Sequence, residues 1–332
     1  MGKLNTGKVI KWVFLILILL SIIVFLAKSD LSALKKELST VGYRFIYILL
    51  STFVAYLLGT LAWWICLGPA KKQVNLTDLF AIRQIGETVG LFNPTSIIGG
   101  DLLKAKILTS YNIPLKDGLN SVAISRITAI LSQLSLFLIA MLWLMLSPIK
   151  DEVLRYTGTA IYIVCTFLLL MVAFTFYWLV SAKSAPVAIL PKATFIGKVK
   201  THFQSMLWSV KDFYQQQNKV FWYSYLLFAL HWIIGSLEFY FILKFLGIAA
   251  QPIHGLILDM SVIVLKSIGA FIPGQLGVEE IANKLLLNMI GITGGSIWLS
   301  ASILRRARQL VWIGLGFIFY LCIKRKPIHV IV

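Results

Sequence analysis

The sequence predicts an all-α integral membrane protein with about six transmembrane helices and two re-entrant helical hairpins that form an inverted repeat. Three observations predict this fold class: an apolar composition, basic residues placed between the apolar runs, and two matching segments that interrupt the apolar pattern. Of the 332 residues, 59% are hydrophobic and 13% are charged. A soluble core could not bury so much apolar surface, whereas a bilayer is itself an apolar solvent.

The charge pattern indicates membrane topology and lipid partners. The net charge is +18, from 31 Lys and Arg against 13 Asp and Glu. Such an excess can indicate nucleic-acid binding. We exclude nucleic acid because the basic residues lie between the hydrophobic runs and form no soluble basic domain. The pattern favours positive-inside topology and contact with membrane lipids, anionic ones in particular.

Cysteine and histidine usage suggests neither a disulfide framework nor a metal site. The three cysteines are Cys66, Cys165 and Cys322, and none forms a Cys-x-x-Cys pair. No two of the four histidines share a helix face at metal-ligand spacing. We therefore expect no metal and no cofactor.

Six segments are long and apolar enough to cross about 30 Å of hydrocarbon as helices. They lie at residues 9–27, 44–67, 118–147, 156–180, 220–247 and 296–323. The basic linker 181–219 and both termini are predicted to be cytoplasmic by the positive-inside rule. The crossing count closes only if residues 76–116 and 252–292 add no net crossing. Residues 28–44 then lie outside in spite of their basic side chains, which conflicts with the rule.

The two non-crossing segments are predicted to be re-entrant hairpins. Both are moderately apolar, are interrupted by Gly and Pro, and carry charges. A broken backbone at membrane depth is tolerated only where protein or a wet cavity covers the freed polar groups. The whole chain, 1–332, is therefore expected to form one membrane domain. Repeat 1 covers about 44–180 with hairpin 76–116, and repeat 2 covers about 220–323 with hairpin 252–292.

The two hairpins share a motif at a constant spacing. The motif is Gly90-Leu91-Phe92-Asn93-Pro94 in the first hairpin and Gly269-Ala270-Phe271-Ile272-Pro273 in the second. The offset of 179 residues also relates Glu87 to Lys266, Asp101 to Glu280, and Arg126 to Arg305. A shared register of this length indicates an internal repeat. In the predicted topology the hairpins enter from opposite sides, so the repeats are inverted, as in many secondary transporters.

Three arginines inside the predicted spans are candidate ligands of a phosphate group. Arg126 lies in the third span, and Arg305 and Arg308 share one face of the sixth. A charge at mid-membrane costs about 2.5–3.5 kcal/mol on insertion scales, so it normally has a partner or water. The planar, permanently charged guanidinium suits a phosphodiester. The alternatives are snorkelling to the interface or structural pairing with Asp101 and Glu280.

The hairpins supply further candidate residues. Asp101 and Glu280 are predicted either to act in gating or proton coupling, or to cap the second half-helix or form a structural ion pair. Lys104 is predicted to reach lipid headgroups, with interfacial snorkelling as the alternative. The helix breakers are Pro94 and Pro273, and the glycines expected to allow close backbone approach to a headgroup are Gly99, Gly100, Gly274 and Gly277.

These motifs resemble the lysylphosphatidylglycerol synthase/flippase membrane-region family. The first family block corresponds to Asn93-Pro94, Gly99-Gly100-Asp101 and Lys104, and the second to Pro273-Gly274-Gln275-Leu276-Gly277-Val278-Glu279-Glu280, followed by Arg305. Two positions depart from the family pattern. Lys104 stands where arginine is commoner, and Ser96 stands where a basic residue is frequent. The resemblance covers roughly residues 10–323.

The resemblance implies a multi-pass protein of the bacterial cytoplasmic (inner) membrane that binds or moves a lipid with an anionic or modified headgroup. It does not imply aminoacyl transfer, because a separate soluble domain does that chemistry in bifunctional relatives, and we expect no room for one before Val332. The leading hypothesis is a flippase-like lipid translocator that is not an enzyme. One alternative is a scaffold or accessory subunit of a cell-envelope lipid or polysaccharide pathway, with 181–219 as its docking surface. The other is a membrane enzyme acting on lipid-linked substrates, although clustered catalytic side chains are lacking. A second copy of the chain or an envelope-synthesis protein is a further candidate partner.

Overall fold

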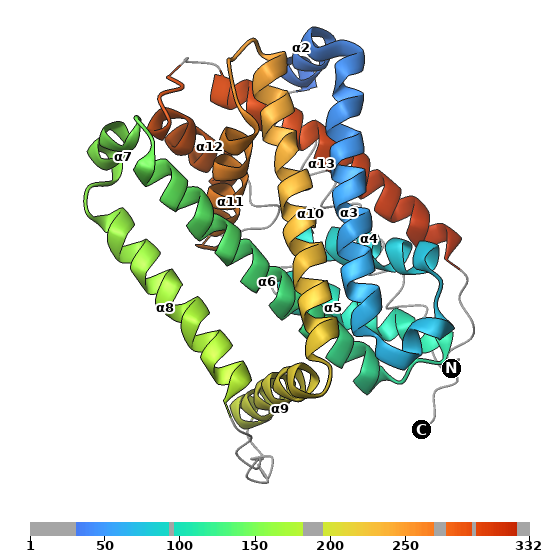
Figure 1. Ribbon diagram of the computed structural model, residues 1–332. Helices are drawn as coiled ribbons and strands as arrows, with labels where there is room; N and C mark the ends of the chain where they lie inside the picture. The colour runs from blue at the N-terminus through green and yellow to red at the C-terminus, as the bar shows by residue number, and fades with distance from the viewer. Residues whose placement is uncertain (1–30, 93–95, 182–194, 269–276, 294–296, 324–332) are drawn as a thin grey trace.

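The computed structural model describes residues 31–92, 96–181, 195–268, 277–293 and 297–323 (Figure 1). These residues are almost entirely helical, and no strand occurs among them. The helices are α2 (Leu31–Val41), α3 (Phe45–Cys66), α4 (Leu76–Phe92), α5 (Ser96–Leu108), α6 (Leu115–Leu146), α7 (Lys150–Thr157), α8 (Ala160–Val180), α9 (Phe195–Gln216), α10 (Asn218–Phe245), α11 (Pro252–Ile268), α12 (Val278–Met289) and α13 (Ile297–Cys322), with short 3-10 turns η1 (Gly42–Arg44), η2 (Gly68–Gln73) and η3 (Thr109–Tyr111). The predicted all-α class is confirmed.

Four helical stretches are long and apolar enough to cross a membrane: Lys35–Cys66, which contains α3, and the helices α6, α8 and α10. They coincide with four of the predicted spans. Helix α13 coincides with the sixth, and its 26 residues rise about 39 Å, but three arginines interrupt its apolar character. The predicted first span, 9–27, lies outside the described residues. The protein is thus a multi-pass membrane protein, whereas the full number of crossings, the inner-membrane location and the cytoplasmic termini remain predictions.

Each predicted hairpin contains a pair of helices. The range 76–116 contains α4 and α5, and the range 252–292 contains α11 and α12. In Figure 1 the α4–α5 pair lies in the middle to lower right of the molecule, and the α11–α12 pair lies in the upper left, near α7. The connections that contain Pro94, Pro273 and Gly274 lie outside the described residues. Re-entry of the pairs into the membrane remains a prediction.

Each helix pair packs against a long helix from the other half of the chain. Helices α3 and α10 pack together along their lengths, α4 contacts α13, and α11 contacts α6. The first helix of each pair therefore packs on the long helix that follows the other pair. Small residues allow these close approaches. A Cβ at Gly255 of α11 would lie 2.7 Å from the Ser236 carbonyl oxygen of α10, and one at Gly316 of α13 would overlap Thr88 of α4.

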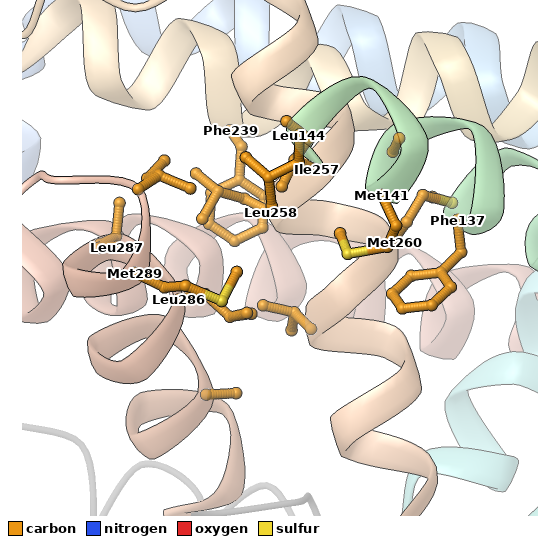
Figure 2. Close-up of a cluster of buried hydrophobic side chains, with 14 of the residues drawn as sticks. Phe137, Met141, Leu144, Phe239, Ile257, Leu258, Met260, Leu286, Leu287 and Met289 are labelled. Atoms are coloured by element: carbon orange, nitrogen blue, oxygen red, sulfur yellow. The ribbon is translucent and has the colours of Figure 1, made fainter. Parts of the chain in front are cut away.

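A cluster of buried apolar side chains holds the second helix pair in place. Figure 2 shows it between α6, α10, α11 and α12, with Phe137, Met141, Leu144, Phe239, Ile257, Leu258, Met260, Leu286, Leu287 and Met289 labelled. The cluster lies deep among the helices, so α11 and α12 are fixed by shape as well as by the charges described below.

Helix α8, in contrast, carries most of its apolar side chains on the surface of the molecule. Most of its large apolar side chains are exposed, among them Phe167, Phe174 and Tyr177. In water an apolar surface of this extent would mark an interaction or aggregation site. In a multi-pass membrane protein it is a surface for lipid. The predicted basic linker 181–219 contains α9, which joins α8 to α10 at one end of the molecule (Figure 1).

Candidate functional site

A polar cavity of about 90 Å³ lies among α3, α4, α5, α6 and α10. One water needs about 10–15 Å³ of such space, so the cavity has room for several waters or for a phosphate-sized group. Its charged lining residues are Arg83, Glu87, Asp101, Lys104 and Arg126. Its aromatic walls include Trp63, Phe228, His231 and Trp232. The cavity therefore combines apolar walls with convergent charges, as ligand sites commonly do.

Asp101 and Arg126 form a forked ion pair at the cavity. Arg126 Nη2 lies 2.6 Å from Asp101 Oδ1, and Arg126 Nε lies 3.0 Å from Oδ2. The structural pairing considered for Arg126 is thus present. The alternative helix cap for Asp101 is wrong, because α5 starts at Ser96 and Asp101 already lies in its second turn. The Arg126 side chain is 32% exposed, so the guanidinium remains accessible from the cavity.

Lys104 joins both carboxylates of the cavity. Its Nζ lies 2.6 Å from Glu87 Oε1 on α4 and 3.1 Å from Asp101 Oδ1. Gly86 makes this position possible, because a Cβ at residue 86 would overlap the Lys104 stem. Gly100 has a different role from the headgroup approach expected of it: a Cβ there would overlap the Gly86 carbonyl oxygen, so it brings α5 close to α4.

Arg83 is the cavity residue that the sequence analysis missed. Its Nη1 donates to the Tyr56 carbonyl oxygen at 3.4 Å, and its guanidinium lies 5.4 Å from the centre of the Tyr56 ring. Within the described residues no carboxylate lies at ion-pair distance from it, although Glu87 attracts it electrostatically. Gly59 gives it space, since a Cβ there would lie 2.9 Å from Nη2. Its spacing of four from Glu87 was the available signal, because i, i+4 residues share a helix face.

Arg305 lies outside this cavity, in a second charged cluster. Its Nε donates to Glu279 Oε1 at 2.7 Å and its Nη1 to Asp259 Oδ1 at 3.1 Å, while Glu238 Oε2 lies 4.0 Å away. The guanidinium also lies 4.0 Å from the centre of the Phe239 ring. The side chain is 5% exposed, so these partners enclose it.

Arg308 and Lys266 complete the second cluster. Arg308 Nε donates to Glu238 at 2.8 Å, and Lys266 Nζ lies 2.9 Å from Glu279. The cluster comprises three cations and three carboxylates, in Lys266, Arg305, Arg308, Glu238, Asp259 and Glu279, and is neutral. The charged lining of the cavity comprises three cations and two carboxylates, which gives a net charge of +1. Of the predicted headgroup ligands, the structure brings Lys104 and Arg126 together and places Arg305 and Arg308 elsewhere.

Comparison with known proteins identifies the family to which the chain belongs. Residues 11–316 match the transmembrane region of lysylphosphatidylglycerol synthase. The chain belongs to this family. The match spans both helix pairs and both charged clusters, and it associates the protein with lipid or cell-envelope biosynthesis in membranes. No curated protein matches the chain.

In this member of the lysylphosphatidylglycerol synthase family, the acid that pairs with the arginine of the last helix lies one residue before the position predicted from the repeat. The repeat pairs Asp101 with Glu280, but Glu279 is the residue that binds the arginine of the following helix. Glu280 instead accepts the Gly277 N–H at 2.8 Å and pairs with Arg306. Its cap and ion-pair interpretation is therefore correct. Gly277 has a φ of +85°, a conformation that favours glycine, where the chain enters α12.

One tyrosine of the family member contacts both clusters. The Tyr56 carbonyl oxygen accepts from Arg83, and the Tyr56 hydroxyl accepts from Arg308 Nη1 at 2.8 Å. The ring packs edge-on against Trp312, with centroids 4.8 Å apart.

Gly99 is half-buried in the first turns of α5. Gating by these residues, and the expected lack of a metal and cofactor, remain predictions.

Proposed function

We propose that the protein binds the anionic headgroup of a membrane lipid in the polar cavity and carries it across the membrane, as a flippase-like translocator. The observation that carries this proposal is the excess positive charge of the cavity. Arg83 lines a space large enough for a phosphate and has no carboxylate within ion-pair distance among the described residues, although the Glu87 carboxylate attracts it. A phosphodiester with one negative charge would bring the charged lining to neutrality. In a low-dielectric surrounding, that match strongly favours binding.

Arg126 is the second headgroup ligand of the proposal. Its guanidinium already presents a fork to the Asp101 carboxylate, and the same planar geometry fits two phosphate oxygens. Its accessibility allows a phosphate to share or replace that carboxylate. Lys104 keeps Glu87 as a close partner and contributes charge without having to move. Headgroup binding by Arg305 and Arg308 would first require each to give up a buried carboxylate partner.

The arrangement of the helix pairs supports transport over static binding. The two motif prolines are 179 residues apart, and the pairs lie on different sides of the molecule (Figure 1). Each pair contacts the long helix after the other pair. Inverted repeats of this kind expose one central site to the two sides in turn. We propose a carrier that is not an enzyme, because Lys104, Arg126 and both carboxylates of its cavity are held in ion pairs and only Arg83 is left for an anion.

Proteoliposomes containing fluorescent lipids test the proposal. We expect Arg83→Gln to lower the transport of labelled phosphatidylglycerol more than ten-fold, since a hydrogen bond to a charged group is worth about 1.5–3 kcal/mol. Labelled phosphatidylcholine should be much less affected. Arg126→Gln should behave similarly. The control is Arg155→Gln, which removes an exposed arginine of α7 outside the cavity.

Each outcome has a consequence. Equal transport by the protein with and without Arg83 would refute the headgroup site. Binding of the lipid without any transport would refute the carrier. Thermal unfolding of each variant separates loss of the site from loss of the fold, and Arg83→Gln breaks no ion pair of the described residues.

A further inference from the structure

A second hollow, of about 800 Å³, lies on the side of the molecule between η2 and the first half of α10. Its α10 wall is formed by Val220, Tyr223, Leu227 and Leu230, which recur at the three- and four-residue spacing of one helix face. Ile65 of α3 lies on the opposite wall. The hollow is therefore an apolar groove, separate from the polar cavity and lined by none of its charged residues.

One end of the groove carries a pair of cations. Lys71 and Lys72 of η2 line it, and neither forms an ion pair within the described residues. Lys71 is held in place, because its Nζ lies 5.1 Å from the centre of the Trp64 ring and Trp64 Nε1 donates to its carbonyl oxygen at 3.2 Å. Lys72 is exposed. Gln217 adds an amide at the same end.

The groove has the length of one membrane leaflet. From Gln217 to Leu230, α10 rises about 20 Å at 1.5 Å per residue. Half of the hydrocarbon core of a bilayer is about 15 Å thick. An amphiphile with its phosphate on the lysines would thus lay its acyl chains along Tyr223 and Leu230 within a single leaflet.

We propose that this groove holds one anionic diacyl phospholipid, with its phosphate on Lys71 and Lys72 and its acyl chains along α10. The site is independent of the proposed transport, because it shares no residue with the polar cavity. The same lysines also line a neighbouring hollow near η3, but Asp78 faces that hollow, and its carboxylate disfavours an anion there. Charge and shape together select the apolar groove.

The charges also disfavour the nearest competing occupant, which is the chain's own N-terminal segment. Residues 9–27 are apolar, but they follow Lys3, Lys8 and Lys11. Their positive-inside orientation would bring those lysines to the end of the molecule that carries Lys71 and Lys72. Like charges repel there, whereas a phospholipid phosphate is attracted.

Native mass spectrometry of the full chain titrated with phosphatidylglycerol or phosphatidylcholine tests the site. We expect retention of phosphatidylglycerol and weaker retention of phosphatidylcholine. Each basic residue near an anionic lipid changes affinity about five-fold, so Lys71→Gln with Lys72→Gln should weaken the first binding event ~30-fold. The matched control is Lys106→Gln with Lys116→Gln, which removes two exposed lysines outside the groove. Equal weakening by the two double variants would overturn the proposal, as would equal retention of both lipids.

A photo-crosslinking residue at Leu227 identifies the occupant directly. A phospholipid adduct on the intact mass supports the site. An adduct to residues 9–27, or to a second copy of the chain, would overturn it.

Inorganic phosphate serves as the second probe. If it competes with phosphatidylglycerol as well as a diacyl phospholipid does, the apolar walls contribute nothing and the proposal is wrong.

Discussion

Replacing Gly86 by alanine tests whether the lysine of the polar cavity is placed by the space that this glycine leaves. A Cβ at residue 86 would lie 2.9 Å from Lys104 Cδ and closer still to Cγ and Cε. The crowded atoms belong to the stem of the lysine, so the whole side chain must move. Moving it separates Nζ from both Glu87 and Asp101.

The expected magnitude follows from two opposing effects. A Gly→Ala change inside a helix normally stabilises by about 0.5–1 kcal/mol. Two hydrogen bonds between charged groups, each worth about 1.5–3 kcal/mol, are lost when Lys104 is displaced. The net result is a destabilisation of about 2–5 kcal/mol. Gly314→Ala is the matched control, because no atom lies within 4 Å of a Cβ there, and it should stabilise or have no effect.

Thermal and denaturant unfolding in detergent micelles measure both changes. A double-mutant cycle with Lys104→Ala makes the test specific, since the clash disappears once the stem is removed. In that background Gly86→Ala should stabilise by up to about 1 kcal/mol, which is its propensity effect alone. If Gly86→Ala is as stable as Gly314→Ala, or if its cost is unchanged without Lys104, the reasoning is refuted.

Two further predictions concern the second cluster and η3. Glu279→Gln leaves Arg305 and Lys266 without a shared carboxylate and should destabilise by about 3–5 kcal/mol in thermal unfolding. Glu280→Gln should cost only about 1 kcal/mol, as a lost cap does, and the reverse order would contradict the assignment. Burial, and then the Asp78 carboxylate, raise the pKa of Tyr111 to about 12, so the folded state favours the neutral phenol. This contribution to stability is complete below pH ~10 and is lost as pH rises toward 12; Asp78→Asn should lower the midpoint of an ultraviolet difference titration.

The sequence was most informative where the signal was local. Hydropathy located α3, α6, α8 and α10 to within a few residues, because a run of apolar side chains is itself the cause of a span. Pro94, Pro273 and Gly274 fall between the observed helices of their pairs, whereas Gly99 and Gly100, expected to precede the second half-helix, lie inside α5. Arg126 and Asp101, both identified as candidates, meet because they flank one short connection between neighbouring helices.

The sequence was least informative where partners are distant. Arg305 lies beside Asp259 and Glu238, which are 46 and 67 residues earlier in the chain, and no local pattern relates them. That Arg305 pairs with Glu279, and not with Glu280 as the repeat predicted, has a different cause. Helix α5 starts five residues before Asp101, but α12 starts only two residues before Glu280. Equivalent positions therefore point in different directions, and a constant offset could not reveal it.

Tyr56 has a thermodynamic consequence for the two clusters. Its carbonyl oxygen is held by Arg83 in the polar cavity, and its hydroxyl by Arg308 in the neutral cluster. A ligand that draws Arg83 away from Tyr56 changes the free energy of the contact with Arg308 whenever the tyrosine shifts. For the anion proposed to bind Arg83, linkage makes this effect reciprocal: what stabilises one position of Tyr56 for Arg308 changes the affinity of Arg83 for that anion by the same factor. The proposed occupancy of the cavity and the state of the second cluster would thus be two readouts of the position of one residue, Tyr56.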